Sequence, residues 1–403
     1  MTKLEAPGAL DGIRVIDLST VVLGPWAAQM MGDMGADVIK VETPEGDMTR
    51  YAGPSRNKGM AAFFLGTNRN KRSVVLNLRS AEGQEALARL VAGADVLLHN
   101  FRPKVAAKLG ITHDRFAKDN PRLIYCATYG FRGDGPMADN AAYDDIIQAA
   151  SGVADLQTVT SDQPRFVPTI MADKTSSLAL LSAVLAAIIH RERGGSGQAI
   201  EVPMFETMVD FVMVEHLAGA AFDPPEGGMG YQRLLNTMRK PYATTDGYLA
   251  VLPYTDANWR DFFRIADRGD LAADPRFKDH ATRIAHSQEV YGFLAEIVAT
   301  RATAEWERDL AKAGIPVQAV LSKEDLLTNE QLLATGFWRF AEHPTEGRIR
   351  MTDPPARFSA SPSAIRRLQP RLGEHSAEIL GEAGYTADEI AALFAAGASK
   401  PAA

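Results

Sequence analysis

The chain has 403 residues, of which 46% are hydrophobic, and this is more than one average domain of about 100 to 200 residues needs. With 43 Lys and Arg against 50 Asp and Glu, the net charge is -7. This balance excludes a general electrostatic surface for nucleic acid or for an anionic membrane, so any anionic ligand must be met locally. The only cysteine, Cys126, excludes an internal disulfide and a thiolate metal cluster, which indicates a cytoplasmic protein without a metal site.

The first part of the chain alternates short apolar runs with amphipathic helical segments. The apolar runs, each a candidate strand, lie at residues 14–18, 37–41, 73–76, 95–99 and 123–127. The helical segments between them include residues 27–34 and 80–92, the second of which opens with Ser80. This alternation predicts an α/β domain with a Rossmann-like, mostly parallel sheet and helices on both faces.

The longest apolar stretch covers residues 178–189 and is interrupted only by Ser182. It falls short of the roughly 18 residues that span a bilayer, so it predicts a buried helix and no membrane partner. The segment Pro224-Pro225-Glu226-Gly227-Gly228 cannot continue a helix or a strand, and we expect it to end a large domain of residues 1–224.

The second part of the chain predicts a smaller α+β domain at residues 225–325. Residues 242–252 have the pattern of a hairpin, with Asp246-Gly247 at its turn. Helical stretches follow at residues 259–265, 287–301 and 303–313, and an apolar strand follows at residues 315–320. Residues 326–403 are expected to return to the large domain, with a helix near residues 388–396 and an alanine-rich end that frays.

Basic residues gather near the ends of the candidate strands, at Arg50, residues 68–72, residues 102–104 and Lys108. One interpretation is a solvated polar face, and the other is a local anion site. Ligands of open parallel sheets bind beyond the carboxyl ends of the strands, where Asn100-Phe101-Arg102 must lie. This placement favours a phosphate-bearing ligand.

Asp173 stands just before the long apolar helix, which the pattern starts near Ser177. An aspartate there is most simply an N-cap of that helix. A carboxylate can also act as a nucleophile that forms a covalent intermediate. Position alone does not separate the two roles.

Several segments together resemble the family III CoA-transferases, also called the CaiB/BaiF family, which include formyl-CoA transferase and the carnitine CoA-transferases, with 2-methylacyl-CoA racemases as relatives. The matching segments are residues 10–18 with Gly24-Pro25, residues 35–42 with 46–50, residues 70–73, residues 94–97 with 100–103, residues 170–173, Gly195-Ser196-Gly197-Gln198 and Gly373-Glu374-His375. Their common order along the chain makes coincidence improbable.

The resemblance implies that Asp173 is the nucleophile, that a coenzyme A thioester is a substrate, and that no cofactor is bound permanently. Backbone N–H groups near the helix start would stabilise the oxyanion. The partners would be an acyl-CoA and a carboxylic acid, and the assembly an interlocked homodimer. The residues that it implies for binding coenzyme A are Val21, Asn70, Lys71, Arg72, Asn100, Phe101, Arg102, Lys108 and Tyr143.

The sequence also departs from parts of the family. The racemases carry a histidine where this chain has Tyr143, and formyl-CoA transferase carries Gln and Trp near Val22 and Ala52. These differences argue against racemisation and against oxalate. Arg233 and Arg239 either hold a second carboxylate of the acceptor or belong to solvated surface.

The expected function is therefore transfer of coenzyme A from an acyl-CoA, with succinyl-CoA as a candidate donor, to a carboxylic acid. The alternatives are a 2-methylacyl-CoA racemase or another acyl-CoA isomerase, and a CoA-binding protein without chemistry.

Overall fold

The computed structural model describes residues 6–402, and the chain divides into two compact units. The large unit comprises Met1–Val153, Phe166–Phe211 and Leu333–Ala403, and the small unit comprises Ala154–Arg165 and Val212–Leu332. The small unit thus begins before the expected boundary at residue 224, because the second half of helix α10 (Met204–His216) groups with it. The chain returns to the large unit at Leu333.

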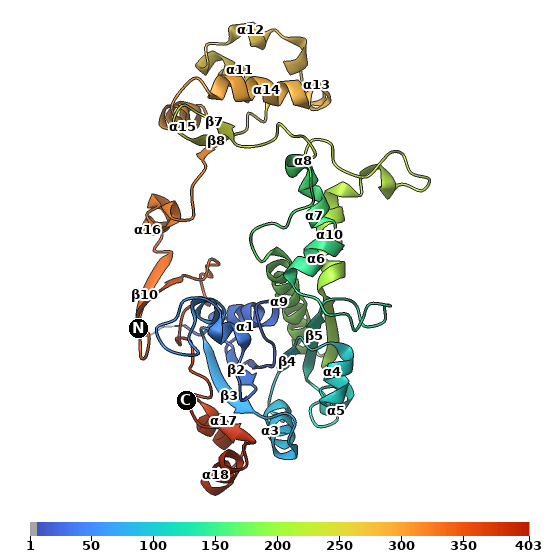
Figure 1. The fold of residues 1–403 in the computed structure, drawn as a ribbon, viewed down its shortest axis with the longest axis vertical. Coiled ribbons are helices and arrows are strands. Elements are labelled where there is room, and N and C mark those ends of the chain that lie inside the picture. The colour runs from blue at the N-terminus through green and yellow to red at the C-terminus, as the bar shows by residue number, and fades with distance from the viewer. Residues whose placement is uncertain (1–5, 403) are drawn as a thin grey trace. The chain divides into compact units, whose positions relative to one another are not determined.

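The large unit is built on a seven-stranded sheet with strand order β12-β3-β2-β1-β4-β5-β6. Strands β2, β3, β4 and β5 of this sheet are labelled in Figure 1. Its strands are β1 (Arg14–Asp17), β2 (Asp37–Glu42), β3 (Lys71–Leu76), β4 (Val96–His99), β5 (Ile124–Tyr129), β6 (Gln198–Pro203) and β12 (Ser399–Lys400). All neighbours pair in parallel except β12, which runs antiparallel to β3. The predicted Rossmann-like parallel sheet is confirmed, with all five expected strands in place.

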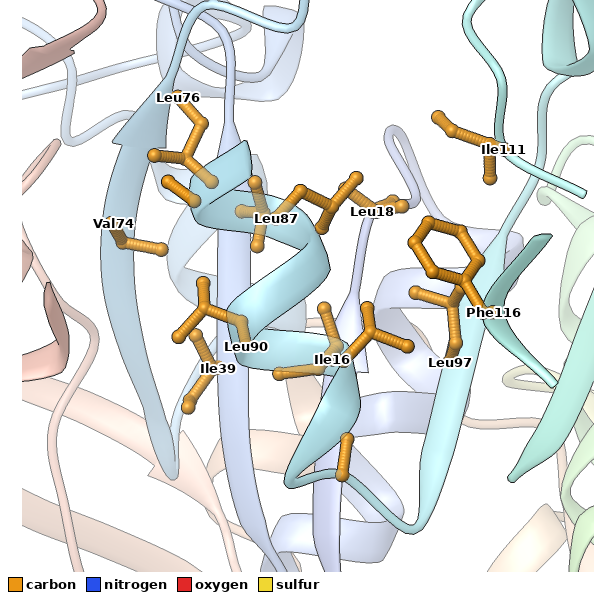
Figure 2. Close-up of a cluster of buried hydrophobic side chains, with 14 of the residues drawn as sticks. Ile16, Leu18, Ile39, Val74, Leu76, Leu87, Leu90, Leu97, Ile111 and Phe116 are labelled. Carbon is orange, nitrogen blue, oxygen red and sulfur yellow. The ribbon is translucent and has the colours of Figure 1, made fainter. Parts of the chain in front are cut away.

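Helices cover the sheet on both sides because its central strands are apolar on both faces. Figure 2 shows one such contact, in which helix α3 (Ala81–Ala92) packs Leu87 and Leu90 onto Ile16 and Ile39 of the strands. The helix starts at Ser80, whose side chain accepts a hydrogen bond from the Gly83 backbone N–H at 3.0 Å. Burial of each such aliphatic side chain stabilises the fold by about 1.5 to 3 kcal/mol.

The other helices of the large unit lie along the chain in the order of their labels. They are α1 (Leu23–Asp33), η1 (Met48–Tyr51), α2 (Ala62–Thr67), α4 (Pro103–Lys108), α5 (His113–Phe116), α6 (Asp144–Ala150), α9 (Met171–Glu192), α17 (Ser376–Glu382) and α18 (Ala387–Ala395). A two-stranded antiparallel ribbon, β10 (Trp338–His343) and β11 (Gly347–Thr352), completes the unit.

Helix α9 is long and apolar enough to cross a membrane by length and composition, but half of its most apolar window is buried. It packs against α1 and β6. It also carries the buried polar side chains of Asp173, Ser176 and Arg191. We therefore interpret α9 as a core helix, in agreement with the expected buried helix.

Within the described residues, the alanine-rich end of the chain is paired with the sheet and does not fray, contrary to the expectation. Ser399 and Lys400 form strand β12 on the outer edge of β3, and the buried Ser399 hydroxyl donates to the Val75 carbonyl at 2.6 Å. The strand covers an edge that would otherwise expose unpaired backbone groups. Composition could not reveal this role, because it depends on an open strand elsewhere in the chain.

The small unit combines a three-stranded sheet with a bundle of helices, as the sequence predicts. Its sheet has the order β7-β8-β9, with β7 (Tyr242–Ala243), β8 (Tyr248–Val251) and β9 (Val317–Ala319) all antiparallel. Its longer helices are α11 (Asp256–Ile265), α14 (Ser287–Val298) and α15 (Thr303–Lys312). Trp259, Phe262 and Trp306 lie at the centre of its core.

Buried ion pairs tie the large unit together. Arg50 is 1% exposed, and its guanidinium contacts the Glu42 carboxylate with both arms, at 2.8 and 2.7 Å. It also donates to the backbone carbonyls of Gly59 and Pro370, so it links β2 to the C-terminal segment. Its donors are committed within the protein and do not contribute to an anion site.

Replacement of Arg50 by Met should destabilise the large unit by about 3 to 5 kcal/mol, because it leaves the Glu42 carboxylate buried without its partner. Thermal unfolding would measure this as a lowered Tm. Arg89→Met removes an exposed pair with Glu85 and serves as the control, with an expected Tm close to wild type. Equal effects of the two substitutions would contradict the structural role of the buried pair.

Candidate active site

A cavity of about 440 Å³ opens at the carboxyl ends of β1, β4 and β5 in the large unit. Thr20 and Val21 follow β1, residues 100–102 follow β4, and residues 128–130 end β5. Tyr143, just before α6, and Asp173, in the first turn of α9, complete the wall. This is the edge at which open parallel sheets bind their ligands.

Asp173 is not the N-cap of its helix, so that prediction is wrong. Helix α9 begins at Met171, and Asp173 is its third residue. The cap is supplied from α6, because Asp144 Oδ1 accepts hydrogen bonds from the backbone N–H groups of Ala172 at 2.7 Å and Asp173 at 3.1 Å. Asp144 thereby satisfies two of the N–H groups that a helix start leaves unpaired, and the Asp173 carboxylate is left to the cavity.

The environment of Asp173 makes its carboxylate unusually basic. The residue is only 7% exposed. Burial first, and then the negative charge of Asp144, raise its pKa from 3.8 to about 7. In the part of the chain that the structure describes, no group donates a hydrogen bond to this carboxylate. A carboxylate that is basic, sparsely solvated and unpaired is well suited to act as a nucleophile.

The loop after β1 holds a strained backbone conformation beside the cavity. Val21 has a φ of +73°, which is rare for a β-branched residue and costs on the order of 1 to 3 kcal/mol. Asn100 fixes the preceding residue, since its side chain accepts from the Thr20 N–H at 3.1 Å and donates to the Thr20 carbonyl at 2.8 Å. Asp47, paired with the buried Lys40 at 3.0 Å, accepts from the Val21 N–H at 3.3 Å.

Five of the nine residues expected to bind coenzyme A line this cavity together with Asp173. These residues are Val21, Asn100, Phe101, Arg102 and Tyr143. Arg102 is exposed, precedes α4, and donates to the Asp139 carbonyl at 2.7 Å. A cation in the lining of the cavity is suitable for a phosphate. The first-turn N–H groups of α4 are already bonded, that of Lys104 to Asp139 and that of Val105 to the Arg102 carbonyl.

The structure does not bring the other four expected residues to the cavity. Asn70 bonds to Asp33 at 2.7 Å, and Lys71 is buried against Asp17 at 2.9 Å. Arg72 forms ion pairs with Asp37, Glu378 and Glu382. Lys108 is exposed at the end of α4. The first three stand at the amino end of β3, and their polar groups are committed to the fold.

Sequence reasoning missed several residues that shape the site. Asp144 and Asp47 act through backbone N–H groups, and Thr20 and Tyr129 line the cavity. The one available signal was the pair Asp144-Asp145 at the start of a helical segment, which is typical of a helix N-terminus. It could not show that Asp144 caps a different helix.

Comparison with known proteins now identifies the chemistry. The model of CoA-transferase family III matches residues 10–376. The chain belongs to the family III CoA-transferases. It is 35% identical to the succinate–glutarate CoA-transferase of Agrobacterium fabrum over 93% of this chain and 95% of that protein. It is 30% identical to the formyl-CoA:oxalate CoA-transferase of Escherichia coli O157:H7, over 95% of this chain and 98% of that one.

Solved structures agree with this assignment. A CaiB/BaiF family protein from Brucella suis superposes with a TM-score of 0.80 at 32% identity, over 94% of this chain and 100% of that one. Rv3272 from Mycobacterium tuberculosis superposes with a TM-score of 0.82 at 27% identity, over 93% and 99% of the two chains. The protein is thus an enzyme, a CoA-transferase that acts on CoA thioesters.

The racemase alternative gains no support from the site. Among the described residues, no histidine lines the cavity around Asp173. His99 is buried outside the cavity lining, burial lowers its pKa to about 4, and its Nε2 is paired with the Tyr125 hydroxyl at 2.7 Å. A second acid or base of the imidazole type is therefore not present at the cavity wall.

The raised pKa of Asp173 predicts a pH-dependent cost in stability. Below about pH 4 the residue is protonated in both the folded and the unfolded chain. Between about pH 4 and pH 7 the unfolded chain ionises first, so the wild type loses stability as pH rises. Asp173→Asn should therefore become more stable than wild type over this range, by roughly 2 to 4 kcal/mol above pH 7.

Tm measured from pH 4 to pH 8 checks this prediction. Asp145→Asn removes an exposed carboxylate of α6 and serves as the control. Its difference in Tm from wild type should not grow from pH 4 to pH 8. A constant difference between Asp173→Asn and wild type across the range would show that Asp173 is ionised normally in the folded protein.

Proposed function

We propose that the protein transfers coenzyme A between dicarboxylic acids through a covalent intermediate on Asp173, with succinyl-CoA as donor. The observation that carries the proposal is the Asp173 carboxylate itself, buried at the wall of the cavity with a pKa raised to about 7 by burial and by Asp144. The names of two relatives, a succinate–glutarate CoA-transferase and the human succinyl-CoA:glutarate CoA-transferase, 28% identical over 96% of this chain and 89% of that one, support dicarboxylic substrates.

The proposed reaction begins with attack of the Asp173 carboxylate on the thioester carbonyl of the donor. The C–S bond breaks, and the products are a mixed anhydride and the CoA thiolate. The thiolate then attacks the aspartyl carbonyl, releases succinate and leaves an aspartyl-CoA thioester. The acceptor carboxylate attacks this thioester, expels the CoA thiolate and gives a second mixed anhydride. The thiolate then attacks the acceptor carbonyl of that anhydride, which forms the CoA thioester of the acceptor and releases the Asp173 carboxylate.

The helix start contributes less to oxyanion stabilisation than the sequence suggested. Two of its backbone N–H groups, those of Ala172 and Asp173, are already bonded to Asp144. The positive end of the helix dipole still favours negative charge at the first turn. Exclusion of water from the buried carboxylate protects the activated intermediates from hydrolysis.

We also propose that the protein works in the cytosol as a homodimer. The single cysteine is buried and free, which suits a reducing compartment. Large apolar side chains are exposed on α9 and α10, namely Leu178, Ile189, Phe211 and Val214. Exposed apolar side chains of this size are typical of an interface.

The covalent intermediate predicts an adduct on one peptide. Wild-type protein incubated with succinyl-CoA alone and quenched with hydroxylamine should yield a hydroxamate at Asp173, because an acyl carbonyl activated as an anhydride or thioester reacts with hydroxylamine. Peptide mass spectrometry checks the position. Asp173→Asn should give no adduct and should lose about a thousandfold or more of the exchange between succinate and succinyl-CoA. Full exchange in that variant would exclude Asp173 as the nucleophile.

The role of Asp144 predicts a shift in the pH profile. Asp144→Asn keeps an oxygen that can accept the N–H groups of α9 but removes the charge that raises the pKa of Asp173. The acid limb of kcat/KM should move down by about one pH unit, since burial remains the larger cause. Asp145→Asn is the matched control. If the acid limb of kcat/KM did not move in Asp144→Asn, Asp144 would act only as a helix cap.

A further inference from the structure

The small unit contains a second cavity, of about 540 Å³, whose lining carries positive charge and no negative charge. Arg233, Arg239 and Lys240 contribute to its wall, and no Asp or Glu lines it. The cavity lies within the small unit, formed by residues before β7, by β8, by α14 and by the start of β9. It shares no lining residue with the cavity around Asp173.

The three cations have no counter-ion among the described residues. Within residues 6–402, none of them forms an ion pair, although the chain as a whole has a net charge of -7. Arg239 and Lys240 are exposed. Arg233 is half-buried, and its Nε donates to the Tyr291 hydroxyl at 3.2 Å, which fixes the side chain against α14. Three neighbouring cations without ion-pair partners in one cavity attract an anion, even though the protein as a whole is acidic.

The rest of the lining is mostly apolar. Val251, Leu252 and Val317 supply aliphatic surface, and Tyr242 and Tyr291 supply rings. A highly hydrated ion such as free phosphate gains nothing from such a wall. An aliphatic dicarboxylic acid fits both parts, because its methylene groups can cover the apolar side chains while its carboxylates meet the guanidinium groups.

We propose that this cavity binds a small aliphatic dicarboxylic acid, with Arg233 and Arg239 as the carboxylate ligands and Lys240 as a further positive charge. The inference rests on the proposed function for its substrate class. It gives the two arginines the first of the two roles that the sequence left open, as carboxylate ligands and not as solvated surface.

Calorimetric titration of the full chain with glutarate, without any CoA compound, tests the proposal. Wild type should bind glutarate, and Arg239→Gln should bind it at least about tenfold more weakly. Arg260→Gln removes the same charge from an exposed position of α11 in the same unit, outside the cavity, and should bind like wild type. Pentanoate, which has the same chain length and one carboxylate, should bind at least about tenfold more weakly than glutarate.

Hydrogen exchange locates the binding site, and Tm shows whether the variant is folded. Glutarate should protect peptides covering residues 233–242 and 248–252 in the wild type, and Arg239→Gln should retain the wild-type Tm because the side chain is exposed. Unchanged glutarate affinity in Arg239→Gln, or protection elsewhere only, would overturn the proposal. Loss of affinity for adenosine 3′,5′-bisphosphate with unchanged glutarate binding would assign the cations to the phosphates of coenzyme A instead.

The two proposals fail independently. Trapping at Asp173 uses wild-type protein and the thioester donor without free dicarboxylic acid, whereas the titration uses glutarate without a thioester. An adduct without glutarate binding would contradict only the proposal for the second cavity. Glutarate binding without an adduct would contradict only the covalent mechanism.

Discussion

The carboxylate of Asp144 at the start of α9 is the contact on which the chemistry of the site depends. One oxygen accepts two backbone N–H groups of the helix, and the other accepts from Gln148 at 2.6 Å. Gln148 in turn accepts from the Val167 N–H at 2.9 Å, so α6 is joined to the segment that leads into α9. Because Asp144 caps the helix, Asp173 has no capping role. The negative charge of Asp144 also raises the pKa of the Asp173 carboxyl.

The same use of buried charge recurs across the sheet. Lys40 pairs with Asp47 and Lys71 pairs with Asp17, all four side chains being fully buried. Such pairs contribute little net stability, because desolvation offsets their attraction, but they are costly to break. Here they hold geometry: the Lys40 and Asp47 pair supports the strained backbone of Val21, which forms part of the cavity wall. Buried ion pairs thus help to hold the backbone of the cavity wall in place.

We propose that the two units recognise different parts of the substrates, because their cavities carry different charges. The large unit offers a buried, basic carboxylate beside a lone exposed arginine, which suits an electrophilic thioester attached to a phosphate-bearing carrier. The small unit offers cations that form no ion pair within residues 6–402, over an apolar wall, and these would suit a charged aliphatic acid. A CoA-transferase must accept both kinds of molecule, and the family assignment gives a reason for both surfaces to occur in one chain.

The sequence by itself determined the architecture and indicated a candidate nucleophile. Apolar runs of four or five residues lie in the strands of a parallel sheet, because burial on both faces favours continuous apolar sequence. The motif around Asp173 identified the candidate nucleophile. Only the tertiary structure decided where its helix starts, since the cap comes from a residue 29 positions away. It also decided the partners of the basic run Asn70-Lys71-Arg72, whose carboxylate partners lie between 35 and 310 positions away in sequence. The sequence shows which side chains carry charge. The partner that neutralises each charge depends on the fold, because it is distant along the chain.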